Sequence, residues 1–106
     1  MLDKKDRTAR AAIIARRVKD MDEAYRVACK TIREDNGKTQ QEIADYLGWT
    51  LERYANFEKG RKHISPGHIS VLAAAMEEDV FVLHQVATDW ASRRTRAQRG
   101  RDKPRR

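Results

Sequence analysis

The stretch that decides the fold of this chain is 39-TQQEIADYLGWTLERYANFEKG-60. It opens on Thr39, a residue type that caps helix N-termini, and Glu42 follows at the spacing of a capping box. Gly48 ends this first short helix, because glycine readily adopts left-handed backbone. Thr50 caps a second helix, which stops at Gly60. The stretch therefore predicts two short helices joined by a tight turn.

The second of these helices has two chemically different sides when residues 50–59 are placed on a helical wheel. The side expected to pack on the first helix consists of Leu51, Tyr54, Phe57 and Glu58. The opposite side carries Glu52, Asn56 and Lys59, with Arg53 and Ala55 on its flanks. Hydrogen-bonding side chains on that side are free to enter a major groove and read base edges. By chemistry Asn56 suits adenine, Arg53 suits guanine or a phosphate, and Glu52 suits the cytosine amino group.

This arrangement resembles the helix-turn-helix family of phage repressors, Cro proteins and small bacterial regulators. The resemblance is carried by Thr39–Ala44, Leu47–Thr50, Tyr54 and Phe57–Gly60, and it extends over about 28–83. It implies that Gln40 meets a phosphate through its side chain and its backbone N–H. The complete set expected to contact DNA is Gln40, Gln41, Thr50, Leu51, Glu52, Arg53, Ala55, Asn56, Lys59, Arg61 and Lys62.

The chain departs from that family in two places. Many members carry Gln, Arg or Ser where Leu51 and Glu52 stand, so the bases that this chain reads are left open. Trp49 occupies a turn position that a smaller valine often holds. We expect Trp49 to cover the core, because large aromatic side chains are mostly buried.

The remaining sequence predicts an all-α protein with five helices. The first starts near Asp3 or Asp6 and ends at Asn36-Gly37, and a break near residues 19–20 is left open. Its apolar stripe, spaced alternately by four and three residues, consists of Ile14, Val18, Met21, Tyr25, Ala28 and Ile32. Ser65-Pro66 starts the fourth helix, and the fifth runs from about Asp79 to Arg93.

Charge divides the chain into three parts, although the net charge is +7. A basic N-terminal extension spans 1–19, a mildly acidic helical domain spans 20–91, and an Arg-rich tail spans 92–106. The tail has no apolar periodicity, so we expect it to be disordered without a ligand. Basic ends flanking a folded unit favour a polyanionic partner, with nucleic acid first.

A single helix-turn-helix covers few base pairs, so we expect a homodimer that reads two half-sites about 34 Å apart. The fifth helix has more apolar residues than one core needs. The candidate dimer interface there consists of Phe81, Val82, Val86 and Trp90. The rival surface is the N-terminal stripe around Ile14, Val18 and Met21.

Several classes of protein are disfavoured. The lone Cys29 is expected to be a small buried hydrophobe. The histidines His63, His68 and His84 are spread over different elements, and His63 and His68 have no third ligand nearby, so we expect no metal site. We find no nucleophile–base pair, and we expect neither enzymatic activity nor a cofactor. No run of 18 apolar residues and no secretory leader occurs, so we expect a cytoplasmic protein without a membrane partner.

The leading hypothesis is a DNA-binding transcription regulator, and specifically a repressor. One alternative is a DNA-binding antitoxin that also binds a toxin as a protein partner. Another is an RNA-binding or protein-binding adaptor on the same fold, which the acidic middle segment favours.

Overall fold

The computed structural model describes residues 3–61 and 65–102. Over these residues it consists of α1 (Lys4–Asp35), α2 (Gln40–Leu47), α3 (Leu51–Glu58), α4 (Pro66–Ala75) and α5 (Val80–Asp102). No strand occurs in the described ranges. The five-helix, all-α prediction is confirmed.

Helix α1 is a single unbroken helix of 32 residues, which resolves the alternative left open near residue 19. Asp3 caps its start, because its side chain accepts a hydrogen bond of 2.8 Å from the backbone N–H of Asp6. Gly37 ends it in the left-handed region, with a φ of 68°. At about 1.5 Å per residue, α1 is about 48 Å long and spans the molecule.

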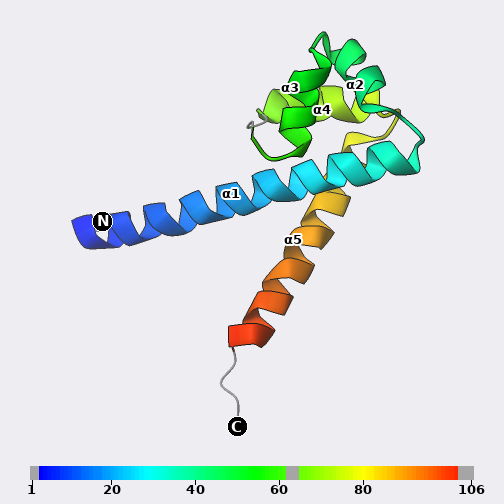
Figure 1. Cartoon of the computed structure of the whole chain (residues 1–106). Helices are drawn as coiled ribbons and strands as arrows, with labels where there is room; N and C mark the ends of the chain where they lie inside the picture. The colour runs from blue at the N-terminus through cyan, green and yellow to red at the C-terminus, as the bar shows by residue number, and fades with distance from the viewer. Residues whose placement is uncertain (1–2, 62–64, 103–106) are drawn as a thin grey trace.

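Helices α2, α3 and α4 gather over the C-terminal half of α1, and α5 crosses α1 and leaves on another side (Figure 1). The core lies between these elements, and its fully buried large side chains are Cys29, Ile43, Tyr54, Phe57, Leu72, Met76 and Leu83. The predicted stripe on α1 is only half covered. Ala28 and Ile32 are buried, whereas Ile14 and Val18 remain 52% and 55% exposed. The N-terminal half of α1 is therefore a projecting helical arm.

The predicted tail, 92–106, differs from its prediction over 92–102, and residues 103–106 lie outside the described ranges. Disorder was expected from Ser92, but α5 continues as a helix to Asp102. The physical reason is that arginine, alanine and glutamine favour helix, and extending an existing helix avoids the unfavourable nucleation step. No proline interrupts the chain between Val80 and Asp102.

Two smaller expectations also need correction. Leu51 was placed on the side of α3 that packs inward, but it stands at the first position of the helix and is 44% exposed. Ser65 precedes α4 as predicted, yet its hydroxyl does not cap the backbone. It lies 2.6 Å from Nδ1 of His68 instead.

Candidate nucleic-acid interface

Helix α2 begins with the capping box predicted from sequence. The hydroxyl of Thr39 accepts a hydrogen bond of 3.1 Å from the backbone N–H of Glu42. In return, the Glu42 carboxylate accepts one of 3.1 Å from the backbone N–H of Thr39. The same backbone hydrogen bond lowers the pKa of Glu42. Donors that a helix N-terminus leaves free are thus satisfied locally, so α2 starts at a defined residue.

The turn between α2 and α3 is held by backbone geometry. Gly48 has a φ of 71°, in the left-handed region. The next N–H, that of Trp49, donates to the carbonyl of Ala44 over 2.9 Å and closes the end of α2. Thr50 then caps α3 by accepting a hydrogen bond of 3.1 Å from the backbone N–H of Arg53. Since both caps are local, the relative placement of α2 and α3 is set within a few residues.

A buried ion pair ties α3 to α1. Arg33 donates from Nε to Oε1 of Glu58 over 2.6 Å and from an Nη to Oε2 over 3.2 Å. Only 4% of the Glu58 side chain is exposed. The hydrogen bond to this carboxylate raises the pKa of Arg33. Arg26 adds a bond of 3.0 Å to the backbone carbonyl of Glu58. The end of α3 is therefore fixed to α1 by bidentate, charge-assisted contacts.

The outer face of α3 presents the side chains expected there. Glu52, Arg53 and Lys59 are exposed, and so is Arg61 just beyond the helix. Ala55 and Asn56 are half-buried. Lys62 and His63 lie outside the described residues. Glu52, Arg53, Lys59 and Arg61 are thus accessible on α3 or directly after it, and whether they touch DNA stays a prediction.

Predicted contact residues at the N-terminal ends of α2 and α3 already make hydrogen bonds within the protein. Gln40 is half-buried, and its Nε2 donates to Oε2 of Glu58, so one of its two amide hydrogens is already used. Gln41 is exposed and donates to Asp45 over 2.7 Å. Thr50 is exposed but uses its hydroxyl as the α3 cap. Sequence reasoning identified Glu58 as structural, but it did not find the contact with Gln40.

A side-chain stack at the start of α3 was not foreseen. The guanidinium carbon of Arg53 lies 4.2 Å from the ring centroid of Trp49. The same indole lies 5.5 Å, centroid to centroid, from the imidazole of His68 on α4. Trp49 is therefore half-buried, packed against the core and also in contact with an exposed residue of α3. The signal in the sequence that could have suggested it is that Trp49 directly precedes the Thr50 cap, within four residues of Arg53 in the first turn of α3.

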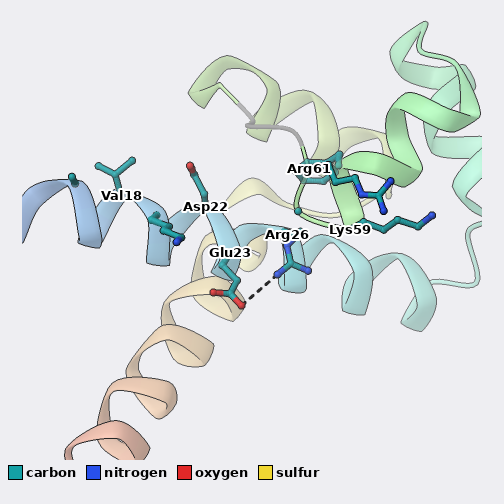
Figure 2. A pocket seen from close by; sticks show the side chains of 10 residues that line it. Val18, Asp22, Glu23, Arg26, Lys59 and Arg61 are labelled. Atoms are coloured by element: carbon teal, nitrogen blue, oxygen red, sulfur yellow. Dashed lines mark ion pairs between the residues drawn. The ribbon is translucent and has the colours of Figure 1, made fainter.

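A groove of about 610 Å³ is lined by α1 residues between Ala15 and Arg26 and by residues between Phe57 and Arg61, at the end of α3 and just beyond it. Figure 2 shows Arg26 on α1 on one wall and Lys59 and Arg61 on the other. Glu23 forms an ion pair of 3.4 Å with Arg26. The groove brings cations that are distant in sequence to the edge of α3, where phosphates would flank a bound helix.

The four candidate dimer residues on α5 differ in exposure: two are exposed and two are half-buried. Phe81 is 78% exposed and Val82 is 42% exposed. Val86 and Trp90 are half-buried and pack against the core of their own chain. The apolar surface left on α5 is therefore smaller than the sequence suggested.

Neither a metal centre nor a membrane segment emerges in the described ranges 3–61 and 65–102. No group of three His, Cys, Asp or Glu side chains is placed to hold a metal ion there. None of the helices described is both long and apolar enough to cross a bilayer. Cys29 is fully buried as predicted, and burial raises its pKa to about 12.

Comparison with known proteins agrees with this geometry. A family model described as helix-turn-helix matches residues 30–83, just over half of the chain. Two crystal structures of the clp gene regulator ClgR from Corynebacterium glutamicum have the same fold. One is 22% identical with a TM-score of 0.68, covering 74% of this chain and 83% of that chain. The other is 25% identical with a TM-score of 0.61, covering 65% and 90%. No curated protein sequence matches.

Proposed function

Because this chain belongs to the helix-turn-helix family of DNA-binding regulators, we propose that it is a homodimeric repressor that reads double-stranded DNA through α3. The single observation that carries the proposal is the exposed polar face of α3 on a helix whose own position is fixed. The caps at Thr39 and Thr50 and the ion pair to Glu58 hold α3 in place. Arg53 on α3 and Lys59 directly after it are exposed to solvent.

Sequence-specific binding follows from the position of each exposed residue along α3. Arg53 and Glu52 lie in its first turn, and the N-terminal residues of a recognition helix are those that reach base edges. Lys59 and Arg61 follow the helix and suit phosphates. The similarity to a protein named as a gene regulator supports regulation as the purpose of this binding.

The proposal is tested by selecting bound sequences from random double-stranded DNA at near-physiological salt. The full chain is compared with Arg53→Ala/Asn56→Ala, and Lys30→Ala serves as a charge control because Lys30 is exposed on α1. We expect the full chain and Lys30→Ala to enrich the same inverted repeat and the double variant to lose it. Equal, sequence-independent retention by all three proteins would contradict the proposal.

The homodimer is supported by unpartnered apolar surface at the start of α5. Phe81 and Val82 are exposed next to the domain that carries α3, while Val86 and Trp90 add less because they already contact the core. We assign the two-fold interface to Phe81 and Val82. The rival surface is the α1 arm, where Ile14 is about half exposed.

Sedimentation of two variants distinguishes these surfaces. Phe81→Glu is expected to yield monomers, because it places a charge in the interface, whereas Ile14→Glu is expected to remain dimeric. If Phe81→Glu remains dimeric and Ile14→Glu yields monomers, the interface lies on α1. A wild-type chain that stays monomeric at micromolar concentration, with and without its DNA, would refute the homodimer.

The basic ends are proposed to add contacts with phosphates outside the recognised bases. Arg93 and Arg96 are exposed on the distal half of α5. Arg93→Gln/Arg96→Gln keeps good helix formers while removing two charges. If both residues contact phosphates, the salt dependence of log Kd should flatten by about 0.9 units per contact. An unchanged slope would exclude these residues as contacts.

A further inference from the structure

We propose that Trp49 is a positioning residue that holds Arg53 for the reading of one guanine in each half-site. The inference rests on the proposed function, since it concerns the same face of α3. It goes beyond that function in two ways. It names guanine as the base that Arg53 reads, and it gives a role to Trp49, a turn residue that does not itself contact the base. The juxtaposition that carries it is the Arg53 guanidinium 4.2 Å from the Trp49 ring centroid.

The backbone of both residues is already fixed. Trp49 follows the left-handed Gly48, and its N–H donates to the carbonyl of Ala44. The backbone N–H of Arg53 is held by the Thr50 cap. What remains free at Arg53 is its long side chain, which is exposed to solvent. An arginine side chain loses rotamer entropy when it is held in one geometry.

The indole restricts that side chain before DNA arrives. Arginine stacks on aromatic faces through its planar guanidinium, and the donors at the edge of that plane remain available. Those donors match O6 and N7 of guanine in a bidentate pair. A lysine at the same position would lack this fork, and a leucine in place of Trp49 would lack the stacking surface. The stack leaves this fork free for a bidentate pair, and the place of Arg53 in the first turn of α3 favours a base edge over a phosphate as its acceptor.

The indole is itself supported from a third element. The imidazole of His68 on α4 lies 5.5 Å from Trp49, and His68 in turn lies 2.6 Å from the hydroxyl of Ser65. Trp49 is thus held between α4 and the first turn of α3. This explains how a large aromatic residue fits a turn while it remains only half-buried.

The first experiment is the same random-DNA selection, run on the full chain and four variants. Arg53→Ala identifies which position of the half-site depends on Arg53. Trp49→Leu removes the stacking surface, and Trp49→Phe keeps an aromatic ring. Tyr46→Leu is the matched control, because Tyr46 is an exposed aromatic residue on α2. Thermal unfolding of each variant is measured alongside.

The result expected is specific to one position. Trp49→Leu should lower the guanine preference at the Arg53-dependent position by about two- to five-fold, the range of an exposed cation–π contact. The other positions and the salt dependence should be unchanged, because no phosphate contact is lost. Trp49→Phe should retain most of the preference, and Tyr46→Leu all of it. An equal loss at every position, or no loss at the Arg53-dependent one, would overturn the inference.

A second experiment needs no DNA and separates this inference from the proposed function. In a Trp90→Phe background Trp49 is the chain's remaining tryptophan. Adding Arg53→Ala should increase quenching of its fluorescence by acrylamide, because the guanidinium no longer covers the ring, whereas Arg61→Ala should not. If the wild-type chain selects no DNA sequence but this quenching rises, the proposed function fails while the stack stands. If quenching does not change, the positioning role fails.

Discussion

Removing one partner of the Arg33–Glu58 ion pair is expected to destabilise the fold more than any exposed charge change. Arg33→Ala leaves the Glu58 carboxylate, 4% exposed, with the Gln40 amide in place of a cation. Glu58→Ala leaves the guanidinium of Arg33 with the carbonyl of Lys38 at 2.9 Å and the more distant carboxylate of Glu34 at 3.7 Å. Either variant therefore buries a charge that has lost its main counterion.

The magnitude follows from that burial. Breaking a buried pair from one side costs about 3–5 kcal/mol, since the remaining charge stays desolvated. Domains of this size have a free energy of unfolding of about 5–15 kcal/mol, so either variant approaches the limit of folding. Glu58→Gln keeps the side-chain volume and one acceptor, and we expect it to cost about 1.5–3 kcal/mol.

The assay is urea unfolding followed by circular dichroism, with a matched control from a pair that is more exposed to solvent than Arg33–Glu58. Lys38 lies 3.2 Å from Glu77, which is largely exposed, so Lys38→Ala should cost less than about 1 kcal/mol. The double variant Arg33→Met/Glu58→Leu removes both charges together. It should cost clearly less than the sum of Arg33→Ala and Glu58→Ala, because no unpaired charge is left behind.

Two results would refute this reasoning. If Arg33→Ala costs no more than Lys38→Ala, the pair does not hold α3 to α1. If the double variant equals the sum of the single variants, the two side chains are not coupled, and the destabilisation comes from lost packing instead.

Two further predictions concern other positions in the fold. Burial, and secondarily the charge of Glu58, raise the pKa of Cys29 to about 12 from 9.0, so the folded chain should resist thiol labelling at pH 8 until urea unfolds it. Because the thiol ionises less readily in the folded chain than in the unfolded one, the free energy of unfolding should fall as the pH rises from 9.0 to about 12. A free energy of unfolding that stays constant over this pH range would contradict the prediction. Gly60→Ala should lower the free energy of unfolding by about 1–2 kcal/mol, since its φ is +81° and the new Cβ would stand 3.0 Å from Nε of Arg26. Gly67→Ala lies in a helix where the new Cβ would meet Oγ of Ser65 at 3.9 Å, an ordinary van der Waals contact, so it should raise that free energy by about 0.4–1 kcal/mol. A similar loss for both variants would show that backbone conformation at Gly60 is not the cause.

The sequence was sufficient for the helix-turn-helix itself. Thr39, Gly48 and Thr50 act on neighbours within a few residues, through caps and a left-handed turn, so the bounds of α2 and α3 follow from local chemistry. The burial of Tyr54 and Phe57 followed from the periodicity of α3 for the same reason. The structural role of Glu58 was also predicted, although its partners were not.

Only the tertiary structure decided where the long-range contacts lie. The pairing of Arg33 with Glu58 joins residues 25 apart in the sequence. The apolar stripe that includes Ile14 and Val18 has the same sequence pattern whether or not a core covers it, and in this fold both side chains remain exposed. Whether Gln40 faces a phosphate or the Glu58 carboxylate depends on where α1 places Arg33. Periodicity shows which side of a helix is apolar, but the approach of another element decides which part of that side is buried and which charges meet there.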